Sequence, residues 1–450
     1  MAPAGGTGRA GRARGPKRPG RPRRLSWPGG RNRPGLGRSF GALWAANSVS
    51  TLGDGVVETA APLLVASVSD DPVLVGLAAF VGQLPWLLFS LVSGAFVDRL
   101  DKRRLIVVVD VLRGAVTAAL ALAVWAGHAT IPVIYACAFL LGTGETLAQN
   151  AASSLVPAVV PSALLPQANA RLHGSFFVLN KFAGRPLGAS LFVLAAALPF
   201  GLDAASFLVS AMVIATMRGL RQEGSGPAAE AGPAGRGGRS VRRDIAEGLR
   251  WVWHEPVIRM MSITLCLMNI TLIAGFSILV LYARDRLGLG AVGYGVLTAS
   301  SAVGGIGGVF MAPALQSRFS ASLLLRAGLV IETLTHVGLA LAAAPWVAGA
   351  VLAVFGVHSS VLGSVETTFR QRRVPEELRG RVQSVFLMFA VGGNVVGALI
   401  GGPLVSWHGV TAPFWCSGAA MAVVTAAAWR PFGRNLDRTP SRSVPVTVQP

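Results

Sequence analysis

The chain has 450 residues, of which 52% are hydrophobic and only 13% are charged. A soluble protein of this length carries about a quarter charged residues, so the composition excludes an ordinary soluble domain and favours a chain surrounded by lipid. The net charge of +20 lies in the gaps between apolar runs and at both chain ends, which argues against one compact nucleic-acid-binding surface.

The first segment, residues 1–38, contains ten arginines, one lysine and no acidic residue. No apolar run with a small-residue cleavage site follows it, so it is not a secretory signal peptide. Its arginine, glycine and proline content predicts a disordered tail. We expect this tail to contact anionic lipid headgroups rather than nucleic acid.

Mostly apolar stretches follow, each near the roughly 20 residues that a helix needs to cross a bilayer. The first six cover residues 40–67, 73–96, 104–126, 131–154, 172–197 and 200–218. The second six cover residues 258–282, 291–314, 321–343, 346–368, 380–404 and 410–430. The sequence therefore predicts an all-α integral membrane protein with twelve transmembrane helices.

The basic residues predict the orientation, because lysine and arginine accumulate on the cytoplasmic side. With the amino terminus in the cytoplasm, both tails, the long central gap and the basic loops lie inside. Of the 40 basic residues, only Arg284 and Arg286 then lie outside, while Arg113, Lys181 and Arg185 lie within spans. We expect a multi-pass protein of the cell inner (plasma) membrane with both termini in the cytoplasm.

The central gap, residues 219–257, begins with a glycine-, proline- and alanine-rich stretch that is typical of a flexible linker. Its second half predicts an amphipathic interfacial helix, because Ile245, Leu249 and Trp253 fall on one helix face.

An internal repeat divides the chain. The Val-Pro pair at 160–161 aligns with the pair at 374–375, and GRPLGA at Gly184 matches GNVVGA at Gly393. These matches predict two pseudo-symmetric six-helix bundles related by an axis along the membrane normal. The predicted boundaries after the N-terminal tail are 39–218 for the first bundle, 219–257 for the linker, 258–430 for the second bundle and 431–450 for a cytoplasmic tail.

Between the second and third spans the chain reads GAFVDRLDKRR, in which Gly94, Asp98, Arg99, Arg103 and Arg104 fit the pattern G-x-x-x-D-R-x-x-R-R. Together with the spans and the repeat, this segment resembles the signature loop of the major facilitator superfamily. STLGDGVVETAAPLL in the first span, SLVPAVVPSALLPQANA after the fourth and RQRRVPEELRGRVQS after the tenth are similar to the drug-efflux branch that includes macrolide-efflux and enterobactin-exporter proteins.

The resemblance implies the major facilitator fold, a substrate cavity between the two halves, alternating access and export driven by proton entry. The segment of the second half that corresponds to GAFVDRLDKRR is GVFMAPALQSR, and it has Ala312 where the first-half segment has Asp98. We therefore expect the first-half loop to act as a conformational latch through charge-assisted hydrogen bonds. The alternative is a solvated charged turn that only sets the topology.

Polar and ionisable residues inside spans are costly and are candidates for function. The candidates for proton coupling and the cavity are Asp54, Glu58, Glu145, Asn180, Lys181 and Arg185. Asp54 and Glu58 are four residues apart, so they share one helix face. Two neighbouring carboxylates raise each other's proton affinity, which suits proton exchange near neutral pH. The alternative for Asp54 is a role in helix packing.

The fifth span contains Arg185 before Pro186 in AGRPLGAS, where antiporter branches usually carry a Gly-Pro pair. We expect Gly184, Pro186 and Gly188 to kink this helix. Arg185 lies near mid-membrane, as does Glu145 in the fourth span, which predicts an ion pair that is either structural or switchable. The added arginine suits an anionic substrate such as a siderophore.

The remaining charges within spans have local explanations. Asp110 and Arg113 are three residues apart and predict a pair that tethers the signature loop. We expect Glu332 and His336 to be packing or lipid-interface residues. We expect His358 to be a packing residue whose hydrogen-bonding groups are satisfied.

Glu366 is near the inner end of the tenth span. We expect it to face Arg370 and Arg373.

Three cysteines lie in apolar runs, and the chain has no nucleotide-binding loop, zinc spacing or hydrolase motif. We therefore predict no enzyme, cofactor or metal. The sequence predicts a monomeric secondary active transporter that exports a drug-like molecule or secondary metabolite by proton antiport. Its partners are the substrate, protons and membrane lipids, without nucleic acid. The alternatives are a siderophore exporter, a lysolipid translocator or, from another class, a transport-inactive membrane sensor or scaffold.

Overall fold

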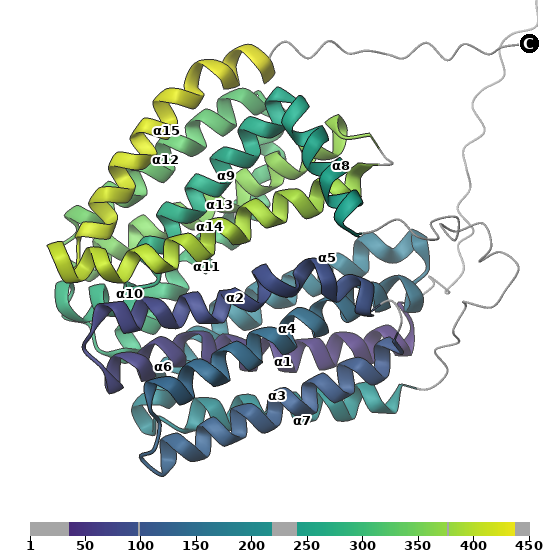
Figure 1. Ribbon diagram of the computed structural model, residues 1–450, viewed down its shortest axis with the longest axis vertical. Helices are drawn as coiled ribbons and strands as arrows, with labels where there is room; N and C mark the ends of the chain where they lie inside the picture. The colour runs from purple at the N-terminus through teal and green to yellow at the C-terminus, as the bar shows by residue number, and fades with distance from the viewer. Residues whose placement is uncertain (1–35, 98–99, 218–240, 376–377, 437–450) are drawn as a thin grey trace, which may run out of the picture. The chain divides into compact units, whose positions relative to one another are not determined.

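The computed structural model describes residues 36–97, 100–217, 241–375 and 378–436, and every regular element in these ranges is a helix (Figure 1). Predictions that concern the tail up to residue 35, Asp98, Arg99, the linker before residue 241 and the tail after residue 436 lie outside the described residues.

The first bundle contains six crossings, coloured purple to teal in Figure 1. They are α1 (Gly37–Val68), α2 (Pro72–Val97), α3 (Lys102–Trp125), α4 (Ile131–Val159), a segmented fifth crossing and α7 (Leu198–Thr216). The fifth crossing consists of α5 (Leu165–Ser175), a π-helical stretch (Phe176–Gly184) and α6 (Arg185–Leu194). Leu36 is buried and α1 begins at Gly37, so the predicted tail is a little too long at its carboxyl end.

The second bundle follows α8 (Val241–His254), in green to yellow in Figure 1. Its seventh crossing is α9 (Pro256–Phe276), continued by α10 (Leu279–Leu281) and a π-turn (Tyr282–Arg286). The others are α11 (Ala291–Arg318), α12 (Ala321–Leu341), α13 (Pro345–Arg373), α14 (Arg379–His408) and α15 (Ala412–Leu436). The last helix therefore extends beyond the predicted end of the bundle at residue 430.

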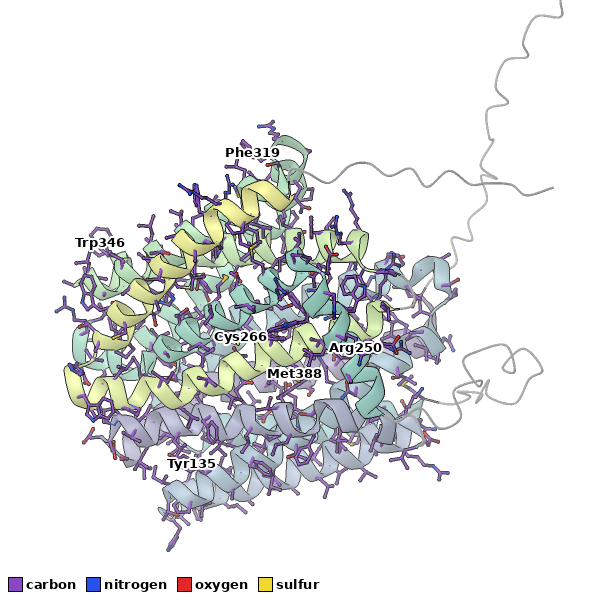
Figure 2. The ribbon with its side chains drawn as sticks, turned by 45° about the horizontal axis from the view of Figure 1, so that its top comes forward. Tyr135, Arg250, Cys266, Phe319, Trp346 and Met388 are labelled. Atoms are coloured by element: carbon purple, nitrogen blue, oxygen red, sulfur yellow. The ribbon has the colours of Figure 1, made fainter. Side chains whose placement is uncertain are left out.

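Eleven of these helices are long and apolar enough to cross a membrane, and the segmented fifth crossing is the twelfth. In no spanning window is more than 50% of the residues buried inside the protein. Large apolar side chains such as Trp125, Phe310 and Trp346 are among the most exposed, and Figure 2 shows Trp346 and Phe319 at the edge of the second bundle. An outward apolar surface is what a lipid solvent requires, and the predicted fold class is confirmed.

Glycines let the fifth and first crossings of each bundle approach closely. A Cβ on Gly184 or Gly188 would overlap the α1 backbone. A Cβ on Gly393 or Gly397 would overlap the α9 backbone in the same way. The glycines that the sequence repeat aligns therefore have the same packing role in both bundles. Each allows close contact with the backbone of the first helix, as is typical of small residues in membrane helices.

The alignment of the two Val-Pro pairs also agrees with the structure. Val160 and Val374 each follow the last residue of a helix, α4 in the first bundle and α13 in the second. The two Val-Pro pairs therefore end equivalent crossings.

The second half of the central gap, where the sequence predicts an interfacial helix, forms α8. One face of α8 packs against α14. Gly248 lies against the backbone of Arg381 on α14, and Glu247 pairs with the Arg381 guanidinium at 2.7 Å. Val252 is completely buried, whereas the neighbouring Trp253 is half-exposed. Gly248 thus fits against α14, and the position of the Trp253 face at the membrane interface stays a prediction.

The two bundles contact each other through α2 with α14 and through α6 with α11. Gly76 lies close to the Ala398 carbonyl, and Gly402 lies close to Val73, near the start of α2 and the end of α14. An ion pair of 3.0 Å joins Asp70, in the α1–α2 loop, to Arg284 at the end of the seventh crossing. The glycine contacts and the Asp70–Arg284 pair lie at the end of the bundles where the α1–α2 loop is.

Candidate functional site

Glu58 is the centre of a three-charge cluster in the first bundle. Lys181 Nζ lies 2.7 Å and 2.9 Å from its two carboxylate oxygens, and Arg185 Nη2 lies 2.7 Å from Oε1. Both cations come from the fifth crossing, which reaches α1 closely because Gly184 and Gly188 have no side chains. Glu58 itself remains 42% exposed, so the cluster is accessible and not enclosed.

Arg185 joins this cluster to the second bundle. Its Nη1 donates to the Thr298 carbonyl of α11 at 3.2 Å, while Nη2 holds Glu58. The side chain is mostly buried, with its Nε lacking a hydrogen-bond partner. One guanidinium therefore connects a carboxylate of α1 to the backbone of the other bundle.

Asp54 lies one turn before Glu58 and pairs with Arg113 of α3 at 2.9 Å. The Arg113 guanidinium carbon also lies 4.1 Å from the centre of the Phe207 ring, a cation–π geometry. Arg113 is almost completely buried, whereas Asp54 is about one-third exposed. The two carboxylates that α1 presents are therefore each balanced by a cation from another helix.

Two predicted ion pairs are wrong. Arg185 pairs with Glu58 rather than with Glu145, which is exposed on α4. Arg113 pairs with Asp54 rather than with Asp110, whose carboxylate accepts a hydrogen bond of 2.7 Å from Ser210 of α7. Asp110 and Arg113 thus contact residues of neighbouring helices instead of each other, and both contact α7.

Asp203 on α7 is a buried acid that sequence reasoning missed. It accepts a hydrogen bond from Ser206, and both side chains lie where a Cβ on Gly53 would be. Gly53 directly precedes Asp54, so Asp203 lies beside the Asp54–Arg113 pair. The signal was available, because Asp203 is an acid within an apolar span and meets the criterion used for Asp54.

Asn180 has a structural position. It is buried, its Nδ2 donates to the Thr51 carbonyl at 3.4 Å, and its backbone touches Gly55. Asn180 therefore helps to fix the crossing of α1 and the π-helical stretch, and its Oδ1 has no hydrogen-bond partner. The π-helical stretch ends at Gly184, and Pro186 is the second residue of α6.

The signature loop is described only in part. Arg103 donates to the Ile214 and Ala215 carbonyls at the end of α7. Arg104 is exposed and pairs loosely with Asp101, whose carboxylate caps the amino end of α3. Gly94 lies in the last turn of α2. These contacts attach the loop within the first bundle, and the role of Asp98 as a latch stays a prediction.

The second bundle contains a buried acid between two histidines. Glu332 Oε2 lies 3.2 Å from His358 Nε2, and Glu332 Oε1 lies 3.6 Å from His336 Nε2. All three side chains are almost completely inaccessible. Of the two positions predicted for Glu332 and His336, buried packing agrees with the structure and the lipid interface does not. His358 is buried and contacts Glu332, as expected of a packing residue with a hydrogen-bond partner.

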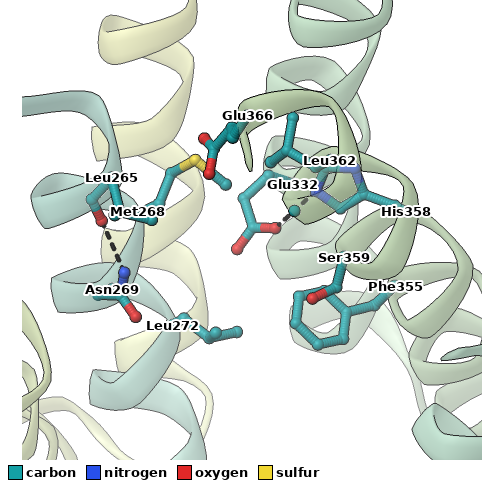
Figure 3. A pocket seen from close by; sticks show the side chains of 11 residues that line it. Leu265, Met268, Asn269, Leu272, Glu332, Phe355, His358, Ser359, Leu362 and Glu366 are labelled. Carbon is teal, nitrogen blue, oxygen red and sulfur yellow. Dashed lines mark hydrogen bonds and ion pairs between the residues drawn. The ribbon is translucent and has the colours of Figure 1, made fainter. Parts of the chain in front are cut away.

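A cavity of about 160 Å³ reaches this group between α9, α12 and α13. Figure 3 shows Glu332, His358 and Glu366 around it, opposite Met268 and Asn269 of α9.

Among the described residues Glu366 forms no ion pair with either arginine predicted for it, although Arg370 is near enough to interact with its charge. Arg373 pairs with Glu255 at 2.8 Å, and Arg370 lies over the Phe386 ring. Among the described residues, no group of histidine, cysteine and acidic side chains has the geometry of a metal site.

Comparisons with known proteins agree with the helix arrangement. The sequence model of the transmembrane secretion effector family matches residues 34–445. The chain belongs to the major facilitator superfamily. It is therefore a multi-pass membrane transport protein of a family that moves small molecules, and nothing in the family points to an enzyme.

Among similar curated proteins is the multidrug efflux pump Tap of Mycolicibacterium fortuitum, 26% identical over 398 residues, which cover 86% of this chain and 94% of that protein. The pump of the same name from Mycobacterium tuberculosis (strain ATCC 25618 / H37Rv) is 26% identical over 418 residues, covering 89% and 95%.

Similar solved structures include the nucleoside transporter NupG, with a TM-score of 0.69, 11% identity and coverage of 88% of this chain and 100% of that one. A bacterial homologue of the iron transporter ferroportin, in its inward-facing state, has a TM-score of 0.68 at 16% identity, covering 88% and 99%. These likenesses support the fold alone.

Proposed function

We propose that this chain exports a drug-like small molecule or a secondary metabolite by proton antiport, with alternating access of a cavity between its bundles. The curated relatives named as multidrug efflux pumps cover nearly the whole chain and support export. The observation that carries the proposal is Arg185, which holds Glu58 of α1 and the Thr298 carbonyl of α11 with one guanidinium. Charge at Glu58 is thereby linked to the contact between bundles.

The proposed coupling starts with a proton on the Glu58 carboxylate. A neutral Glu58 no longer balances Lys181 and Arg185, so the guanidinium loses the partner that orients it toward Thr298. The contact between α6 and α11 then weakens, and the bundles are free to reorient. Glu145, exposed nearby on α4, is the proposed acid through which protons enter and leave the cluster.

The proposed orientation places both termini in the cytoplasm. The contacts at Gly76 and Gly402 and the Asp70–Arg284 pair then lie on the outer side of the membrane. This arrangement corresponds to a state closed outside and open inside. It is the state from which an exporter takes its substrate.

The same cluster bears on the substrate. Lys181 and Arg185 suggested an anionic substrate, but both cations are occupied by Glu58. A drug-like or secondary-metabolite cargo is therefore preferred over a siderophore. The lysolipid translocator and the transport-inactive scaffold have no specific observation in their favour.

The test uses inverted membrane vesicles, ethidium as the probe and Glu58→Gln as the variant. We expect energised wild-type vesicles to accumulate ethidium and to release protons when it is added, and the variant to lose at least about tenfold of this activity. Glu247→Gln is the matched control, because Glu247 also pairs with a basic residue and is 41% exposed, yet it lies on α8 outside the cavity.

We expect the control to retain wild-type transport. Unchanged transport by Glu58→Gln would reject the coupling role of the cluster. The absence of any effect of a proton gradient on accumulation of ethidium or of a compound panel by the wild type would reject antiport itself.

A further inference from the structure

We propose that Glu332, His336 and His358 form a second proton-binding site, inside the second bundle, which carries a coupling proton separately from Glu58. This inference rests on the proposed function for its role in transport. The occupation of the site by a proton is an independent claim about the three side chains.

The first argument is the balance of charge. Two imidazoles converge on one carboxylate, at 3.2 Å and 3.6 Å, and all three groups are almost completely buried. Without an added proton the group carries one negative charge inside the membrane, which is costly. One proton on an imidazole gives a neutral carboxylate–imidazolium pair. The site therefore favours taking up a proton from water.

The second argument is the set of unsatisfied atoms. Glu332 Oε1 and both ring nitrogens of His336 are buried without a hydrogen-bond partner. Buried polar atoms are rarely left in this state without a reason. A proton placed between His336 Nε2 and Glu332 Oε1 would give both atoms a partner after a small approach from 3.6 Å.

The third argument is access. The cavity of about 160 Å³ touches Glu332 and His358 but not His336. A water molecule occupies about 30 Å³, so this space holds several waters. His358 is therefore the residue at which a proton enters (Figure 3), whereas His336 contacts Glu332 but does not line the cavity.

The surroundings contain few other charges. Glu366 lines the same cavity two helical turns along α13 from His358, and Arg370 lies one turn further. From α9 the polar side chain in the cavity is Asn269, and the described residues of α12 add only His336 to the group. No arginine or lysine reaches Glu332 among the described residues, in contrast to Glu58, so its charge is balanced only by a proton.

The first experiment measures proton binding without any substrate. Purified full-length protein and its Glu332→Gln variant are titrated from about pH 9 to about pH 5 in detergent, the range in which histidines change charge. We expect the variant to bind about one proton fewer, because a buried imidazole without its carboxylate stays neutral. Identical proton uptake by the two proteins overturns the site, whatever the chain transports.

The second experiment separates proton coupling from structure. Proteoliposomes are loaded with an acidic lumen and supplied with ethidium, and ethidium exchange is also measured without a gradient. We expect Glu332→Gln and His358→Gln to lose at least about tenfold of gradient-driven accumulation while keeping exchange within about twofold. Equal loss of both activities in both variants identifies a structural group and overturns the proposal, as does normal accumulation.

Two controls complete the test. Ser359→Ala changes a residue that lines the same cavity without altering charge, and should leave both activities unchanged. Treatment with a metal chelator should also change nothing, whereas a loss of proton uptake or transport on chelation identifies a metal site and overturns the proposal. A wild type that ignores the gradient but binds the extra proton rejects antiport while leaving the proton site in place.

Discussion

The two bundles balance the acids of their charge clusters in different ways. In the first bundle Asp54 and Glu58 pair with arginine and lysine side chains, Arg113, Lys181 and Arg185. In the second, Glu332 meets only imidazoles, which become positive only when they bind a proton. Charge in the first cluster is therefore fixed by side chains, and charge in the second by proton occupancy.

The backbone does not share this difference. Gly188 and Gly397 occupy equivalent places, each against the first helix of its bundle. The repeat has thus kept the close crossing of helices, whereas the charged side chains have diverged. Scaffold and chemistry are separable in this chain, because helix packing depends on small residues and charge balance depends on a few long ones.

The largest expected effect on stability comes from breaking a fixed ion pair. Arg113→Met leaves Asp54 without its partner, and we expect a loss of about 3 kcal/mol in the free energy of unfolding, the lower end for buried pairs because Asp54 is partly exposed. Unfolding in detergent micelles measures this change. Combining it with Asp54→Asn should restore more than half of the loss.

The matched change in the second bundle is His358→Gln, which replaces one neutral hydrogen-bonding group with another. We expect it to cost about 1 kcal/mol. If Arg113→Met and His358→Gln lose equal stability, the contrast between fixed charge and proton-dependent charge is wrong.

The next effect tests the shared scaffold. Gly188→Val and Gly397→Val each push a side chain into the backbone of the first helix of a bundle, and we expect each to cost about 2 to 3 kcal/mol. The control is Gly363→Ala on α13, where a Cβ would meet nothing within 4 Å. Thermal unfolding of the three variants measures the difference, and a large effect at only one of the two glycine sites contradicts their equivalence.

The scaffold was predictable from sequence because it depends on repeating features. Apolar length predicted the crossings, and the glycine repeat predicted which positions correspond between the bundles. The presence of acids within spans likewise identified Asp54, Glu58 and Glu145 as candidates. Each of these signals is local or periodic, so one sequence contains it.

The partners of the charges were not predictable in the same way. Glu145 and Arg185 lie at similar depth, but depth does not specify the direction in which a side chain points. A π-helical stretch precedes Arg185, and its wider turn changes which residues face α1 compared with an α-helix. His358 and Glu332 are on different helices, and only the packing of α12 against α13 brings them together.

The smallest expected effect concerns the contact between bundles rather than either cluster. Asp70 and Arg284 form an exposed pair at the end that the proposed orientation places outside, and such pairs contribute about 1 kcal/mol or less. Asp70→Asn should therefore shift the balance between access states by no more than about fivefold. The readout uses a protein in which the native cysteines are replaced and Ser359, which lines the cavity between α9, α12 and α13, is changed to cysteine. The rate at which a membrane-impermeant maleimide alkylates this cysteine is measured in inverted vesicles.

We expect the rate to fall, because weakening a contact on the outer side reduces the fraction of molecules that are open inside. Glu247→Gln, on α8, should leave it unchanged. A rise in the rate would mean that this contact lies on the cytoplasmic side and that the proposed orientation is reversed. A fall much larger than fivefold would mean that the exposed pair, rather than the Arg185 link between Glu58 and Thr298, holds the bundles in the observed state.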